Sequence, residues 1–126
     1  MSAKILVVED EIDLSEAYEI ILNSAGYEVV LAHDGYDALT VLKKFEPNII
    51  LLDLRMPRVS GLEFLQQYNV KQAHPKVKII VFSNLDAQDE INQAYELGAD
   101  RYILKAWASP KELLKLVEDT LNESTE

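Results

Sequence analysis

The chain has 126 residues, of which 48% are hydrophobic and 27% are charged. This size and composition predict a single domain over residues 1–126, with its core in about residues 4–122 and no output domain. We expect a cytoplasmic protein, because no run approaches the roughly 20 apolar residues of a membrane helix and the first strand pattern follows Met1 without a leader. The absence of cysteine excludes disulfides and thiolate metal sites. The 22 acids and 12 bases give a net charge of −10, which argues against direct nucleic-acid binding.

Five short apolar runs have the length and the β-branched content of strands. Most of them are continuous rather than alternating, which indicates strands that are covered on both faces, as in a parallel sheet between helices. In chain order the runs are Ile5–Val8, Val29–Leu31, Ile49–Leu52, Ile79–Phe82 and Tyr102–Leu104.

Helical periodicity fills the intervals between these runs and predicts an α/β fold of five strand-helix units. Ser109 and Ser60, each followed three residues later by glutamate, predict capped helix starts, and Asp13 is expected to cap the first helix. Gly26 and Gly98 lie where helices would end with a left-handed residue. The expected helices cover residues 13–25, 35–45, 60–72, 87–97 and 110–122.

Polar residues follow four of the apolar runs. The first run ends in Glu9-Asp10-Glu11, the third in Asp53, the fourth in Ser83-Asn84 and the fifth in Lys105. In a parallel sheet with right-handed crossovers, all strands end at the same edge, where ligands bind. We therefore expect these side chains to converge.

Three of the converging side chains, Glu9, Asp10 and Asp53, are acids that would repel one another unless they shared a proton or a cation. Carboxylate oxygens favour Mg²⁺, or Mn²⁺ in its place, which keeps several waters and binds beside phosphoryl groups. Capping of the next helix would also explain acids at this place, and we assign that role to Glu11. The acid that shifts the balance is Asp53, because it directly follows a buried run.

The remaining groups suit phosphoryl transfer. Asp53 is the predicted nucleophile and would form an acyl phosphate, while the metal ion and Lys105 would offset charge on the phosphoryl oxygens. The hydroxyl of Ser83 would donate to the same oxygens. Taken singly, Lys105 could be a surface ion-pair partner and Ser83 a turn residue.

The chain resembles the receiver domain of two-component response regulators, the family that includes the single-domain chemotaxis regulator. Three parts of the sequence carry the resemblance: Lys4–Glu11, Asp53–Gly61, and the pair Ser83 and Lys105. It implies a doubly wound, flavodoxin-like five-stranded parallel sheet in the order 2-1-3-4-5.

The resemblance also implies a role for each site residue. Asp53 would accept a phosphoryl group from a phosphohistidine on a sensor histidine kinase or a phosphotransfer protein. Glu9, Asp10, Asp53 and the backbone carbonyl of Arg55 would bind Mg²⁺. Ser83 and Lys105 would bind the phosphoryl oxygens.

The family couples the hydroxyl residue to an aromatic residue on the last strand, and Tyr102 matches that position. Phosphorylation would then draw Ser83 inward and let Tyr102 turn in, unless Tyr102 is simply a core residue. The output surface would be the face formed by the fourth and fifth helices and the last strand, where a downstream protein would bind. The protein would be a monomer or a phosphorylation-dependent dimer, with no membrane partner.

The sequence departs from the family pattern near the site. Lys105 precedes Ala106 where the family commonly has a cis-proline, so this peptide is either trans or strained. Asn84 replaces a usually small residue and would alter access to Asp53, and the charge of Arg55 would affect the lifetime of the phosphoryl group.

Three other functions compete with a phosphorylated switch. An aspartate-nucleophile phosphatase would usually need a second acid where Arg55 stands, and a flavin carrier would need a phosphate-binding loop where Glu9-Asp10-Glu11 stands. A receiver-like scaffold that works without phosphorylation is the third. We expect no enzyme beyond self-phosphorylation and self-dephosphorylation.

Overall fold

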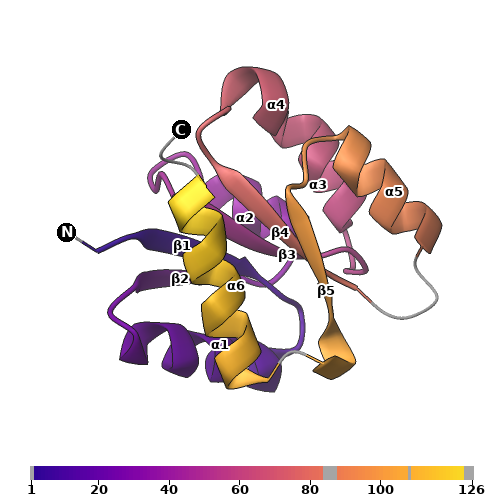
Figure 1. Cartoon of the computed structure of the whole chain (residues 1–126). Helices are drawn as coiled ribbons and strands as arrows, with labels where there is room; N and C mark the ends of the chain where they lie inside the picture. Colours follow the sequence, from indigo (N-terminus) through magenta and orange to yellow (C-terminus); the bar gives the residue numbers. More distant parts are fainter. Residues whose placement is uncertain (1, 84–87, 108, 124–126) are drawn as a thin grey trace.

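The computed structural model describes residues 2–83, 88–107 and 109–123. Five parallel strands form one sheet in the order β2-β1-β3-β4-β5, which confirms the predicted topology (Figure 1). The strands are β1 (Lys4–Val8), β2 (Glu28–Ala32), β3 (Ile49–Asp53), β4 (Lys78–Ser83) and β5 (Arg101–Leu104). The helices are α1 (Ile12–Ser24), α2 (Gly35–Val41), α3 (Gly61–Tyr68), α4 (Val70–Ala73), α5 (Gln88–Glu96) and α6 (Pro110–Glu123), with a short 3₁₀ helix, η1 (Lys105–Trp107).

The continuous apolar runs are explained by a core on each face of the sheet. Along β1, Ile5 and Val7 face the layer of α1 and α6, while Leu6 and Val8 face the layer of α2, α3 and α5. The strand β3 alternates in the same way and is buried along its whole length. Burial on both faces removes the polar half of the usual alternation, so the central strands are apolar at nearly every position.

Local chemistry sets most helix ends as predicted. Ser60 and Glu63 form a complete capping box at the start of α3, and Ser109 accepts a hydrogen bond from the backbone N–H of Glu112 at 3.2 Å. Gly26 and Gly98 have φ angles of +93° and +117°, so both occupy the region that favours glycine.

Three helix predictions were wrong. The first helix begins at Ile12, so Asp13 lies inside it, and Glu11 stands at the N-cap without a side-chain capping bond. The second helix ends at Val41 rather than at residue 45. The third, predicted over 60–72, is interrupted at Asn69, whose φ of 56° is left-handed.

The interruption at Asn69 brings two rings together. Tyr68 ends α3 and His74 follows α4, and their rings stack with centroids 4.1 Å apart and planes inclined by 5°. Burial, together with the charge of Glu46, raises the pKa of Tyr68 from 10.0 to about 12. Within the described residues, no helix is long and apolar enough to cross a membrane.

The raised pKa of Tyr68 predicts a loss of stability in alkali. Above about pH 10 the unfolded chain releases the Tyr68 proton while the folded chain retains it. Tyr68 therefore contributes a fall of about 1.4 kcal/mol per pH unit in the free energy of unfolding until about pH 12, and Tyr18 adds its own contribution. Urea unfolding across this range should show a shallower decline in Tyr68→Phe than in the wild type. Tyr36→Phe, which changes an exposed tyrosine, is the control and should keep the wild-type slope; equal slopes in all three proteins would contradict the prediction.

Candidate functional site

The carboxyl edge of the sheet gathers the acids and the cation that the sequence singled out. Because β1 pairs with β3 and β3 with β4, the chain positions after these strands lie side by side. Glu9 and Asp10 follow β1, Asp53 is the last residue of β3, and Lys105 follows β5. Glu9 and Asp53 are buried, whereas Asp10 is exposed to solvent.

Lys105 lies between the two buried carboxylates. Its Nζ is 2.9 Å from Asp53 Oδ2 and 3.2 Å from Glu9 Oε1. Burying an unpaired carboxylate is costly, so this ammonium group compensates for much of the cost at both positions. The backbone N–H of Arg55 adds a hydrogen bond to Asp53 Oδ1 at 3.2 Å.

One ammonium group does not balance both acids. Burial and the charge of Asp53 raise the pKa of Glu9 from 4.5 to about 7. Burial also raises the pKa of Asp53, although its bond with Lys105 opposes the shift. Burial alone would lower the pKa of Lys105, but Asp53 and Glu9 raise it. The two buried acids therefore repel each other, and either a proton or a further cation would relieve the repulsion.

The geometry of the acids suits such a cation. One carboxylate oxygen each from Glu9, Asp10 and Asp53 lies within 4.8 Å of the others. Hard oxygen ligands open to water on the Asp10 side fit Mg²⁺, which retains waters when it binds proteins. The carbonyl of Arg55 as a further ligand stays a prediction.

Ser83 brings a hydroxyl to the same edge. It ends β4 and is 3% exposed, and its Oγ has no hydrogen-bond partner among the described residues. Buried hydroxyls are nearly always satisfied, so an unsatisfied one calls for an explanation. A phosphoryl oxygen bound at Asp53 would supply the missing acceptor.

Tyr102 lies at the surface and not in the core. It is 43% exposed, and its ring meets that of Tyr95 of α5 edge to face, with centroids 6.3 Å apart. The core alternative for Tyr102 is therefore wrong. Its role in a rotameric switch stays a prediction.

A family model described as the response regulator receiver domain matches residues 5–118. The chain belongs to this family. Among solved structures it is similar to a CheY-like receiver domain protein from Methanospirillum hungatei, with 26% identity and a TM-score of 0.90 over 99% of this chain and 98% of that one. It is also similar to the chemotaxis protein CheY4 of Vibrio cholerae, with 28% identity and a TM-score of 0.87 over 95% of this chain and 99% of that one.

Curated relatives are longer than this receiver domain. It is 38% identical to a probable transcriptional regulator, ycf27, of Porphyridium aerugineum over 94% of this chain and 48% of the relative. It is 32% identical to the DNA-binding response regulator MtrA of Mycobacterium tuberculosis over 98% of this chain and 53% of the relative. The chain thus spans about half the length of these relatives.

Two departures from the receiver pattern are visible in the structure. The described residues contain no cis peptide, so the peptide between Lys105 and Ala106 is trans, and the chain continues as η1. The side chain of Arg55 turns to Glu90 of α5. Asn84, the third departure, lies outside the described residues.

The structure also brings to this edge Asp34, a residue that the sequence analysis did not predict. Asp34 follows β2 at the same edge and is buried, where it caps α2 and accepts a 2.5 Å bond from Arg58. The rule that polar residues after parallel strands converge at one edge applies to β2 as well, and it would have predicted Asp34. Asp34 and Gly35 together fix the loop that follows Asp53. Asp34 binds Arg58 of this loop, and the backbone N–H of Gly35 donates to the carbonyl of Val59 at 3.0 Å.

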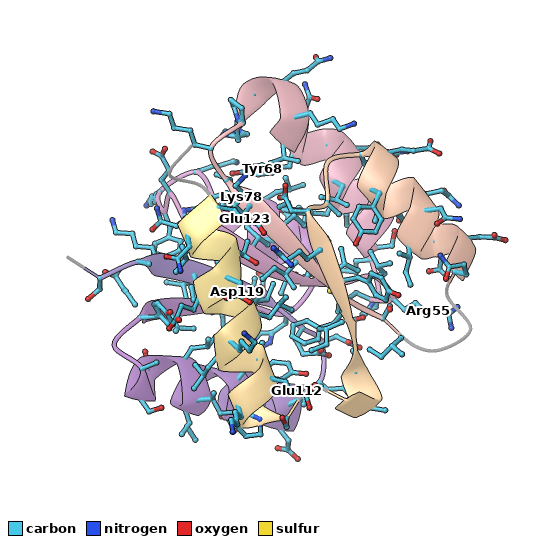
Figure 2. All side chains as sticks on the ribbon, in the orientation of Figure 1. Arg55, Tyr68, Lys78, Glu112, Asp119 and Glu123 are labelled. Carbon is cyan, nitrogen blue, oxygen red and sulfur yellow. The ribbon has the colours of Figure 1, made fainter. Side chains whose placement is uncertain are left out.

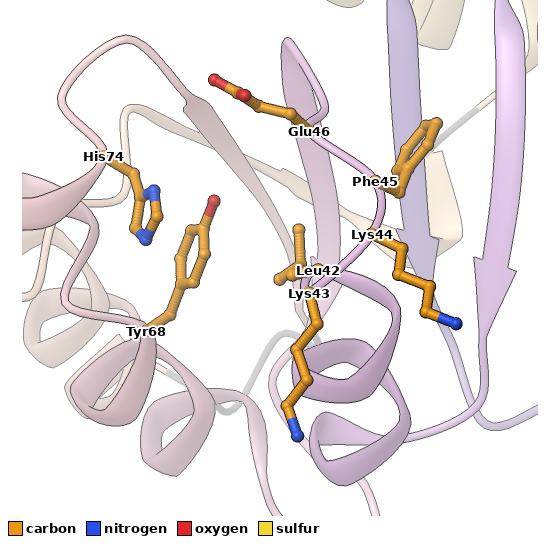
Figure 3. A pocket seen from close by; sticks show the side chains of 7 residues that line it. All are labelled: Leu42, Lys43, Lys44, Phe45, Glu46, Tyr68 and His74. Carbon is orange, nitrogen blue, oxygen red and sulfur yellow. The ribbon is translucent and has the colours of Figure 1, made fainter.

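A cavity of about 470 Å³ lies at the opposite edge of the sheet, between the end of α2 and the turn that follows α4. Figure 3 shows Tyr68 and His74 on one side of it and the lysines that follow α2 on the other. The side chains predicted for the site do not line this cavity: Glu9, Asp10, Asp53, Ser83, Lys105 and Tyr102. The chemistry of the carboxyl edge is therefore separate from this cavity.

Gly61 is predicted to be essential for the position of Asp53. An added Cβ would lie 2.6 Å from the carbonyl oxygen of Asp53 and 2.7 Å from Leu54 Cα, both of which are backbone atoms. We expect Gly61→Ala to lower the free energy of unfolding by about 2–3 kcal/mol. Gly26→Ala meets no atom within 4 Å and should cost only about 1 kcal/mol for its positive φ. Equal losses in urea unfolding would contradict this account.

Proposed function

We propose that this receiver domain is a phosphorylation-activated switch that accepts a phosphoryl group on Asp53 in the presence of Mg²⁺. The observation that carries the proposal is the position of Lys105, whose ammonium group contacts both Asp53 and Glu9. Phosphoryl acceptance needs a carboxylate nucleophile with cations around the oxygens that carry charge. The unsatisfied hydroxyl of Ser83 adds a donor for the same oxygens.

The donor in this proposal is a phosphohistidine on a sensor histidine kinase or a phosphotransfer protein. An Asp53 oxygen attacks phosphorus, the phosphorus–nitrogen bond breaks, and its electron pair returns to the imidazole, which then takes up a proton. Mg²⁺ held by Glu9, Asp10 and Asp53 would stabilise charge on the phosphoryl oxygens. Lys105, bound to Asp53 at 2.9 Å, holds the carboxylate in place.

The output of the switch is the face formed by α5, β5 and α6. Ser83 pairs in register with Leu104 of β5, so movement of Ser83 toward a phosphoryl group acts directly on that strand. Tyr102 stands on the same strand at the surface, in contact with Tyr95. We propose that Tyr102 turns inward as Ser83 moves, and that the altered face binds a downstream protein rather than nucleic acid.

Phosphorylation is tested directly with a small acyl-phosphate donor and Mg²⁺. Intact-mass spectrometry should show one added phosphoryl group on the wild type and none on Asp53→Asn. Asp13→Asn, which removes an exposed acid of α1, is the control and should still be modified. An unmodified wild type, or an Asp53→Asn protein that is still modified, would refute the proposed acceptor.

Mg²⁺ binding is tested without phosphorylation. A metal ion that binds only the folded state stabilises it, by about 1.4 kcal/mol at a free concentration ten times its Kd. Thermal unfolding should therefore shift upward with Mg²⁺ in the wild type and in Asp13→Asn, and by much less in Asp10→Asn. A shift of the same size in Asp10→Asn would show that the ion binds elsewhere.

A further inference from the structure

Arg55 connects the phosphoacceptor to α5. Its backbone N–H donates to Asp53 Oδ1 at 3.2 Å, while its Nε and Nη2 donate to the same Glu90 oxygen at 3.0 and 2.7 Å. Figure 2 shows Arg55 beside the end of α5 where that helix begins. One residue therefore contacts both the proposed site of modification and an element of the proposed output face.

The pair is strong enough to hold a side chain but weak enough to be exchanged. Two charged nitrogens share one carboxylate oxygen at short distance, which is a charge-assisted interaction. The side chains are 45% and 29% exposed, so solvent screens the pair. An arginine held in this way can leave its partner for a group that carries more charge.

A phosphoryl group on Asp53 is such a competitor. It carries nearly two negative charges and three acceptor oxygens, against one charge on Glu90. The planar guanidinium group matches phosphate oxygens as well as it matches a carboxylate. Lys105 is already shared between Asp53 and Glu9, so it would not neutralise a dianion at this place alone, and a second cationic side chain would be attracted.

The helix α5 has other anchors that would survive loss of the pair. Ile91 and Ala94 are buried against the sheet. Release of Glu90 would free the beginning of the helix while its apolar side stays attached. We call the ion pair between Arg55 and Glu90 the latch, because it joins the loop that follows Asp53 to α5.

We propose that Glu90 is a positioning residue that holds the Arg55 guanidinium group on α5, and that phosphorylation of Asp53 draws Arg55 away and releases the start of this helix. The inference rests on the proposed function and adds the route by which the acceptor reaches the output face. The two interactions of Arg55 are thermodynamically linked. A change that weakens its bond with Glu90 strengthens phosphoryl binding at Asp53, and phosphoryl binding weakens the bond with Glu90 by the same free energy.

The first experiment measures binding of beryllium trifluoride with Mg²⁺, an unreactive mimic of a phosphoryl group on a carboxylate. Glu90→Gln removes the carboxylate charge that holds the Arg55 guanidinium group through these two bonds, and it should lower the Kd of the mimic about three- to five-fold. Asp89→Asn is the matched control, because it removes the same charge from an exposed acid of the same helical turn, and it should bind like the wild type. In an Arg55→Gln background, Glu90→Gln should have no effect.

The second experiment measures hydrogen exchange of the amides of α5. The mimic should speed exchange at the start of this helix in the wild type. Without any mimic, Glu90→Gln should already exchange faster than Asp89→Asn. Both variants lose one acid that interacts with the helix dipole in the first turn, but Glu90→Gln also loses the 2.7 Å bond with Arg55.

The outcomes separate the two proposals. A wild type that binds no mimic and accepts no phosphoryl group refutes the proposed function. In that case the latch is still tested by comparing hydrogen exchange of Glu90→Gln and Asp89→Asn without any mimic. Equal Kd values and equal exchange for Glu90→Gln and Asp89→Asn overturn the latch. An effect of Glu90→Gln that persists in Arg55→Gln overturns it as well, because the effect would not then pass through Arg55.

Discussion

The architecture of this edge depends on one electrostatic constraint: two carboxylates, Glu9 and Asp53, are buried side by side, and Lys105 lies between them. The sheet brings the three residues together from β1, β3 and the end of β5, so the contact joins segments that are far apart in sequence. Buried acids of this kind destabilise a domain unless cations compensate. The repulsion that remains between the two acids is the physical basis of the proposed Mg²⁺ site.

Much of the fold could be predicted from the sequence, because the strands of a sheet that is covered on both faces are continuous apolar runs. The strand order came from family resemblance and was confirmed. The convergence of Glu9, Asp10, Asp53 and Lys105 followed from the rule that parallel strands end at one edge. The strands could be predicted because each apolar run is a local feature of the sequence. The convergence of the site residues could be predicted because it depends only on the direction of the strands.

Other features were beyond such reasoning because they depend on contacts between distant loops. The break at Asn69 lies within a segment of helical periodicity, and only the observed left-handed φ reveals it. Nothing near Arg55 in the sequence indicates that its partner is Glu90, and nothing near Asp34 indicates Arg58. Tyr102 could be assigned to the last strand, but not to the surface of that strand, since aromatic residues suit both places.

The loop that follows Asp53 is tied differently on its two sides. On the side of β2 and α2 it is fixed by the bond between Arg58 and Asp34 and by the bond from Gly35 to Val59, with Arg58 also over the ring of Tyr36. On the side of α5, among the residues that the structure describes, the partly exposed pair of Arg55 and Glu90 reaches across. A displacement that begins at Asp53 is therefore resisted more strongly on the side of β2 and α2 than on the side of α5. Mechanical strain in this molecule would travel toward β4, β5 and α5, and the half of the domain built on β2 would serve as its fixed support.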